Sequence, residues 1–182
     1  MARVPYVERE ELDADGREIY ERIRRDRNAP KVGLQFRALL HSSEATGHLA
    51  SLGAQLRYRS VLPENLKEFA ILMVSREWNS SIEWTAHAVL AAKAGVSAES
   101  IEAVRTRNVP AGLTAEEAII AEFVLPLLQR KVVSDEAFAA AQKLLGTRGA
   151  VELTLICGYY SALDMAQIAL KLEMEPGKVS TL

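Results

Sequence analysis

The chain has 182 residues, which is enough for one hydrophobic core and short for two independent domains. Hydrophobic residues make up 49% of it and charged residues 25%, as in an ordinary soluble globular protein. The formal net charge is -2, so no overall positive field draws the protein to nucleic acid or to an anionic membrane. We therefore expect neither a nucleic-acid partner nor a membrane partner.

The cysteine content and the N-terminal sequence narrow the class of protein further. The single cysteine, Cys157, excludes an intramolecular disulfide, a CxxC redox pair and a zinc site made of several thiolates. The N-terminal stretch MARVPYVEREELD lacks the apolar core of a signal peptide. The longest apolar segment, residues 151–172, is interrupted by Glu152, Asp164 and Lys171 and makes a poor membrane span. These features predict a cytoplasmic protein.

Helical periodicity runs through nearly every segment, and no strand-like alternation lasts long enough to compete with it. The first expected helix runs from Asp13 to Arg25. The basic run RIRRDR, residues 22–27, falls at its end, where solvated cations suit the helix dipole. A loop with Pro30 and Gly33 follows, and a second helix is expected from Ser43 to about Arg59.

The second half of the chain continues the helical pattern. Pro63 opens PENLKEFAILMVSREW, which carries its apolar side chains on one side, and Trp78 with Asn79 turns the chain. One further helix is expected to end at Gly95, and the next to run from Ser97 to about Arg105. The capping box Thr114–Glu117 starts another helix, and Pro126 should kink this helix or end its first part. The last two helices are expected from Ser134 to Gly146 and from about Ala150 to Met174. Roughly eight helices predict one all-α domain over residues 1–182, a compact bundle.

A group of polar residues marks the candidate site. In SSIEWTAH, residues 80–87, Glu83 and His87 are spaced i,i+4 and share one helix face. Glu68 lies near the start of the preceding helix, and a tight turn makes the two helices an antiparallel pair. We therefore expect Glu68 to reach His87. Two carboxylates around one histidine would hold its tautomer and tune its pKa.

An internal repeat is one interpretation of two further segments, KEFAILMVSREW and VELTLICGYYSA. Superposing Glu68 on Glu152 sets Ser80 opposite Asp164. Chance similarity between two apolar helices is the alternative.

The pattern E-x11-S-x2-E-x3-H, formed by Glu68, Ser80, Glu83 and His87, resembles the core motif of the carboxymuconolactone decarboxylase and alkylhydroperoxidase D-like superfamily. The resemblance continues through LPENLKEFAILMVSREWNSSIEWTAHAVLAAKAGVSAESIEAV, with a motif core at residues 61–105, and more loosely through both flanks. It implies an all-α fold of the alkylhydroperoxidase D-like type that assembles into homo-oligomers, as trimers or hexamers.

The two branches of that family imply different chemistry. The peroxidase branch uses a CxxCxxxH sequence, but Ser80 and Glu83 occupy the two thiol positions here. A serine hydroxyl cannot replace a thiolate as a peroxide nucleophile. An antioxidant peroxidase is therefore the less favoured alternative, and Cys157 lies elsewhere in the chain.

The decarboxylase branch is similar at these positions, and it implies a lyase that needs no metal or organic cofactor. Its substrate would be a small lactone or another carboxylated organic molecule. His87 would be the general acid/base, with Glu68 as its partner or the base itself and Glu83 as the second carboxylate. Ser80 and the Trp84 indole N–H would donate hydrogen bonds to developing negative charge.

Substrate contacts outside the motif are expected from position alone. A substrate carboxylate would need a cation, for which Arg59 is a candidate together with Arg57 and Arg76. Desolvation favours loss of CO₂, so an apolar pocket of Phe36, Leu40 and Trp84 would suit the reaction.

Other interpretations of the same residues stay open. His87 would be a satisfied core histidine, Trp84 a core residue, and Ser80 a helix N-cap. Glu68, Glu83 and His87 would also form a facial metal triad, although no further ligand is evident. The chain would then be a non-catalytic oligomeric binding protein or, in the last case, a metal protein.

Overall fold

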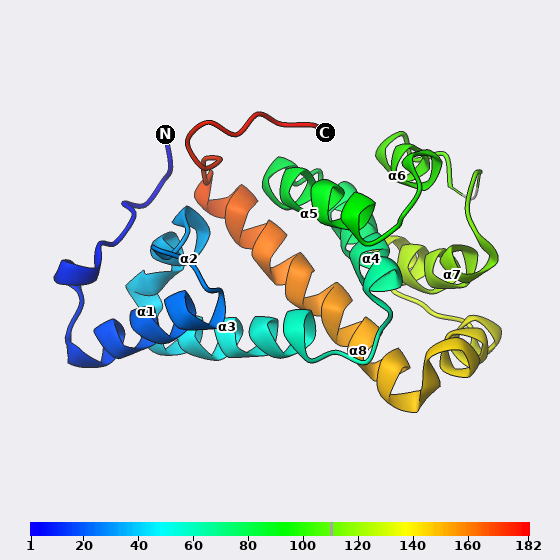
Figure 1. Cartoon of the computed structure of the whole chain (residues 1–182), viewed down its shortest axis with the longest axis horizontal. Coiled ribbons are helices and arrows are strands. Elements are labelled where there is room, and N and C mark those ends of the chain that lie inside the picture. Colours follow the sequence, from blue (N-terminus) through cyan, green and yellow to red (C-terminus); the bar gives the residue numbers. More distant parts are fainter. Residues whose placement is uncertain (110) are drawn as a thin grey trace. The chain divides into compact units, whose positions relative to one another are not determined.

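The computed structural model describes residues 1–109 and 111–182, and these residues are all-helical, without a β-strand (Figure 1). The all-α prediction is therefore confirmed. The chain forms two compact units, one of residues 1–59 with 166–178 and one of residues 60–165 with 179–182. The expectation of a single domain over residues 1–182 stays a prediction.

The first unit is built on two helices that pack together, α1 (Ala14–Asp26) and α3 (Ser43–Tyr58). Asp13 caps α1, since its side chain accepts a hydrogen bond from the Gly16 N–H at 2.8 Å. Short helical segments complete the unit: η1 (Arg9–Glu11), α2 (Leu34–Leu39) and η2 (Leu40–Ser42). Its core is made of Val7, Leu12, Tyr20, Ile23, Val32, Phe36, Leu40 and Ala50.

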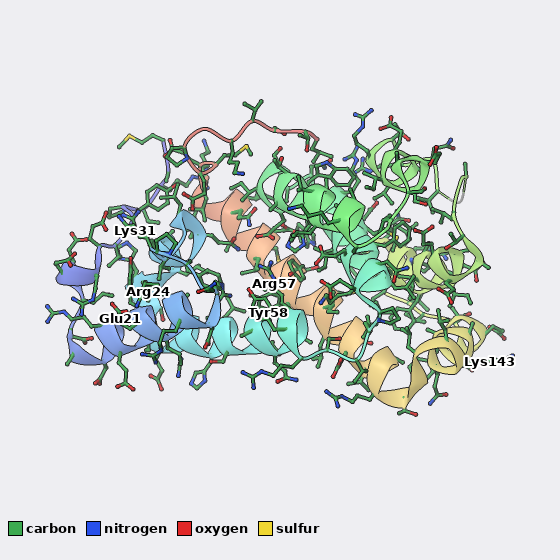
Figure 2. All side chains as sticks on the ribbon, in the orientation of Figure 1. Glu21, Arg24, Lys31, Arg57, Tyr58 and Lys143 are labelled. Atoms are coloured by element: carbon green, nitrogen blue, oxygen red, sulfur yellow. The ribbon has the colours of Figure 1, made fainter. Side chains whose placement is uncertain are left out.

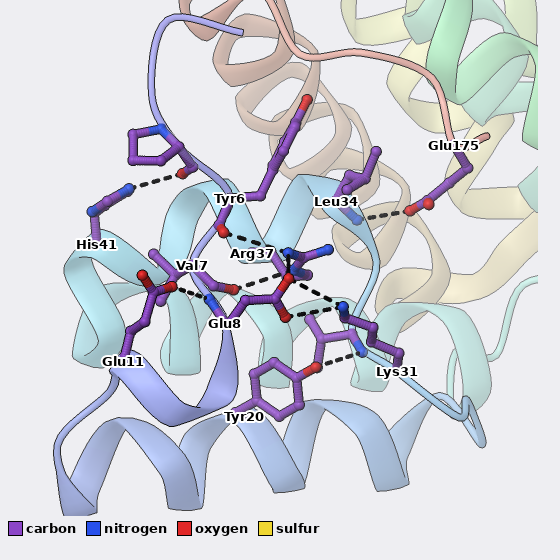
Figure 3. Close-up of polar contacts among 12 residues, drawn as sticks. Tyr6, Val7, Glu8, Glu11, Tyr20, Lys31, Leu34, Arg37, His41 and Glu175 are labelled. Carbon is purple, nitrogen blue, oxygen red and sulfur yellow. Dashed lines mark hydrogen bonds and ion pairs between the residues drawn. The ribbon is translucent and has the colours of Figure 1, made fainter.

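Buried Arg37 ties the N-terminal segment to α2 (Figure 3). Its Nε donates to the Val7 carbonyl at 3.1 Å, and its Nη2 forms an ion pair with Glu8. Lys31 reaches the same carboxylate at 2.9 Å, and His41 contacts the Pro5 carbonyl at 3.0 Å. The contacts of Arg37 with Val7 and Glu8 compensate its guanidinium for the water it loses on burial.

The basic run at residues 22–27 lies at a helix end, as the sequence predicts. Arg24, in the last turn of α1, pairs with Glu21 at 2.9 Å, and both are labelled in Figure 2. The Arg27 guanidinium covers the Phe36 ring at 4.2 Å from its centroid.

The second unit is organised around α4 (Glu64–Glu77), which packs against α5 (Ser81–Lys93), α6 (Ala98–Arg105) and α7 (Ala115–Arg130). Every residue of α4 from Leu66 to Ser75 is buried. The sequence indicated one apolar side, and that expectation was too narrow. A helix with neighbours on several sides is buried all round, which allows Glu68 to lie inside the protein.

Two helices of the second unit end on residues in the left-handed conformation. Asn79 has φ 52°, and the Ser80 N–H returns to the Ser75 carbonyl at 2.8 Å. Gly95 ends α5 in the same way with φ 95°. Asparagine and glycine adopt this conformation at little cost. The predicted turn at Trp78–Asn79 is confirmed, and it makes α4 and α5 a tight hairpin.

The capping box that opens α7 is also confirmed. The Thr114 hydroxyl accepts from the Glu117 N–H at 3.2 Å, and the Glu117 carboxylate accepts from the Thr114 N–H at 2.9 Å. Pro126 does not end the helix, which continues to Arg130.

The long α8 (Asp135–Leu170) contains a break at Gly146, where φ is 73° and ψ is 168°. The sequence placed a helix end at this glycine. The final helix ends at Leu170, earlier than the expected Met174, because Lys171 turns the chain with φ 50°. Among the described residues, α8 is the one helix long and apolar enough to cross a membrane, and 44% of its most apolar window is buried in the protein.

Candidate active site

The α4–α5 hairpin brings together the three residues that the sequence singles out. The His87 Nδ1 lies 2.6 Å from the Glu68 Oε2, although the two residues are on different helices. The His87 Nε2 lies 3.3 Å from the Glu83 Oε2, one turn earlier on α5. Each ring nitrogen therefore faces a carboxylate oxygen.

All three side chains are removed from solvent. His87 is 1% exposed, Glu68 2% and Glu83 7%, so Glu83 is the least buried member. Burial lowers the pKa of His87, but the hydrogen bonds to Glu68 and then Glu83 outweigh this effect, and its pKa is raised overall. A neutral imidazole has one N–H, whereas an imidazolium has two and can donate to both carboxylates. The arrangement thus favours the charged form of His87.

A third carboxyl group, Asp164 on α8, lies close to this cluster. Its side chain is fully buried, and neither oxygen accepts a hydrogen bond of ordinary geometry. Burial raises the pKa of Asp164 to about 8, and the charge of Glu83 adds to this. The nearby Ser80 hydroxyl and His87 act in the opposite direction and offset only part of this increase in pKa. The pKa of Asp164 therefore lies above neutral pH, which favours its protonated form.

Ser80 occupies the N-cap position of α5, but its side chain makes no capping hydrogen bond. The residue is 3% exposed, and its hydroxyl acts on the Asp164 carboxyl. The N-cap interpretation therefore describes the position of Ser80 and not the role of its hydroxyl.

Aromatic side chains pack beside the cluster. The ring of Tyr160, on α8, meets the His87 ring edge to face, with centroids 5.0 Å apart. Tyr159 meets Tyr160 in the same manner at 5.1 Å. Trp84 is 1% exposed and is a core residue directly after Glu83. Tyr160 and Asp164 are one helical turn apart, so α8 contributes both to the neighbourhood of His87.

The predicted substrate-binding residues Phe36 and Arg59 belong to the first unit, not to the unit that contains His87. Phe36 is part of the core of that unit, and Arg59 is the C-cap residue of α3. Arg76 is held at the end of α4, where its Nε donates to the Arg105 carbonyl at 2.6 Å. A substrate contact by Phe36 or Arg59 stays a prediction.

The metal interpretation finds no support in the geometry. Within residues 1–109 and 111–182, no group of three or more His, Cys, Asp or Glu side chains is placed to hold a metal ion. A histidine ligand presents a free nitrogen lone pair to the metal, while both nitrogens of His87 face carboxylates.

Cys157 is a buried thiol in α8. It is 1% exposed, and burial raises its pKa to about 12. It lines a cavity of about 470 Å³ together with Trp78, Leu127 and Gly158. Glu68, Glu83 and His87 do not line this cavity, nor three further cavities formed by residues within 1–109 and 111–182.

Sequence reasoning did not include Asp164 in the candidate site. The signal that could have identified it is an acidic residue in the middle of an apolar helix, since burying a carboxyl group without a partner costs free energy of folding. In comparisons with known proteins, no protein-family model matches the chain, and neither does any curated protein.

Proposed function

We propose that this chain is a cofactor-independent acid/base enzyme, a lyase similar to carboxymuconolactone decarboxylases that acts on a small lactone or another carboxylated organic molecule. The observation that carries the proposal is a buried histidine with a carboxylate at each ring nitrogen. Such a unit stores a proton inside a dry site and can release or take it up during catalysis.

Glu68 and Glu83 would have different roles, because they contact different nitrogens of the His87 ring. Glu68 makes the shorter contact and holds the Nδ1 side of His87, while Glu83 makes the longer contact and is the most exposed of the three. Glu83 and the Nε2 side of the ring would therefore meet the substrate. The substrate C–C bond breaks, CO₂ leaves, and the electron pair moves into a conjugated carbonyl. A proton then forms the new C–H bond at the same carbon.

The resemblance of Glu68, Ser80, Glu83 and His87 to the family pattern supports the same proposal, as does the all-helical fold. The proposal also includes a single domain, self-association as a trimer or hexamer, and a location in the cytoplasm. Large apolar side chains exposed on α5 and α8 favour an oligomer: Val89, Val151, Leu155 and Met165.

A panel of carboxylated γ-lactones and β-keto acids tests the proposal by release of CO₂. We expect Glu68→Gln to lower the rate by about 100-fold or more, the size of a general acid/base contribution. Glu122→Gln is the matched control, because Glu122 is exposed on α7, which also packs against α4. Circular dichroism and sedimentation would verify that the fold and the oligomer are unchanged, and sedimentation tests the trimer or hexamer.

Two results would contradict the proposal. One is a wild-type protein that releases no CO₂ from any compound of the panel, as expected of a non-catalytic binding protein. The other is a rate that Glu68→Gln leaves unchanged.

A further inference from the structure

Asp164 is a buried acid that the proposed division of labour does not use. It lies in the apolar part of α8, fully buried, and both carboxyl oxygens lack a hydrogen bond of ordinary geometry. The groups that act on it are the Ser80 hydroxyl at the N-cap of α5, and the Glu83 carboxylate and His87 ring within α5. On its own helix, Tyr160 is one turn away and contacts His87.

A purely structural role does not explain this residue. Buried polar groups in folded proteins are normally hydrogen-bonded, because an unpaired one costs free energy. Leucine or alanine would fill the position in an apolar helix without that cost. A costly group that persists beside a cluster of titratable residues marks a functional position.

Burial is the main reason that Asp164 carries a proton, and the charge of Glu83 adds to it. Of the groups on α5, the Glu83 carboxylate raises the pKa of Asp164 and His87 lowers it. A third carboxylate in the same dry region would be repelled by Glu83. The neutral acid form is therefore the stable form of Asp164 next to the site.

We propose that Asp164 is the acid that delivers the proton to the substrate carbon, a catalytic residue that completes the cluster of Glu68, Glu83 and His87. This inference rests on the proposed lyase function. When CO₂ leaves, its electron pair passes through the conjugated carbonyl and returns to form the C–H bond as the Asp164 O–H bond breaks. The Asp164 carboxylate then takes a proton from the His87 imidazolium, and water re-protonates His87. One solvent proton is consumed for each CO₂ released.

The protonation state can be measured without any substrate. Protein labelled with ¹³C at the aspartate carboxyl is titrated by NMR, and the Asp164 signal is assigned by its loss in Asp164→Asn. We expect a midpoint near pH 8. Asp135→Asn is the matched control, since Asp135 is exposed at the start of the same helix and its removal should leave that signal in place. A midpoint near pH 4 would overturn the inference and leave the lyase proposal standing.

The catalytic role is tested with the panel compound that the wild type decarboxylates fastest. We expect Asp164→Asn to lower kcat by about 100-fold or more with little change in KM, and to remove the loss of activity above pH 8. Asp164→Glu should restore part of the rate. If Asp164→Asn keeps the wild-type alkaline limb, Asp164 is not the acid, while a large effect of Glu68→Gln would still support the lyase. Absence of wild-type turnover would overturn both.

Discussion

His87 is held by one short and one long contact to carboxylates. The Nδ1 contact to Glu68 measures 2.6 Å, and the Nε2 contact to Glu83 measures 3.3 Å. The pKa of His87 is raised in the folded state, so the native protein binds this proton more tightly than the unfolded chain. Its contribution to stability is complete below pH 6.5 and is lost as pH rises through the folded pKa.

Asp164, like His87, should make the protein less stable as pH rises. Its pKa is about 8 in the folded state and about 3.9 in an unfolded chain, so only the native state keeps the proton between these values. Stability should therefore fall as pH rises from about 4 to about 8, with a slope of about 1.4 kcal/mol per pH unit from this residue. Asparagine at position 164 does not titrate and should remove that slope.

Urea unfolding of the wild type and Asp164→Asn at pH 5, 6, 7 and 8 measures this effect. The difference between the two proteins cancels the titration of groups far from Asp164, so the remaining pH dependence comes from Asp164 and the groups coupled to it. We expect Asp164→Asn to become steadily more stable relative to the wild type as pH rises. A difference that is constant over this range would contradict the neutral state of Asp164.

At the scale of elements, the break in α8 depends on backbone conformation alone. Gly146 has φ 73° and ψ 168°, a region that essentially only glycine adopts. An added Cβ would meet no atom within 4 Å at Gly146 or at Gly158, which lies in the regular part of the same helix. The two glycines therefore differ in backbone conformation and not in the space around them.

Alanine substitutions at these glycines should have opposite effects. Gly146→Ala should lower the free energy of unfolding by about 1–3 kcal/mol through backbone strain. Gly158→Ala should raise it by about 0.5–1 kcal/mol, because alanine is the better helix former. Chemical denaturation of both variants tests this prediction, and equal effects would show that Gly146 does not break the helix.

At the scale of the whole molecule, the reactivity of the buried Cys157 thiol distinguishes the lyase proposal from the thiol peroxidase alternative. The thiolate is the reactive form of cysteine, and a pKa of about 12 makes the thiolate of Cys157 rare at pH 8. We expect dithionitrobenzoate to label native Cys157 roughly three orders of magnitude more slowly than a free cysteine, and rapidly after unfolding. Cys157→Ser should leave any peroxide turnover unchanged. Rapid native labelling, or peroxide turnover that requires Cys157, would favour the peroxidase alternative.

Much of the helical pattern was predictable because its signals are local. The Thr114–Glu117 capping box, the turn at Asn79 and the break at Gly146 are set by residues that act on their own backbone. The end of the last helix was placed too late, since Lys171 in the left-handed conformation has no clear signal in the sequence. The burial of α4 on all sides was missed because periodicity does not count the neighbours of a helix.

The sequence by itself determined the helical class and the two partners of His87. Glu83 follows from the i,i+4 spacing on one helix, and Glu68 follows from the short hairpin that joins α4 to α5. Only the tertiary structure decided that Tyr160 and Asp164 of α8 lie beside this cluster. They are far along the chain from His87, and no local spacing reports contacts made by long-range packing. Burial then decided the protonation state of Asp164, because the pKa of a carboxyl group depends on the groups around it in space.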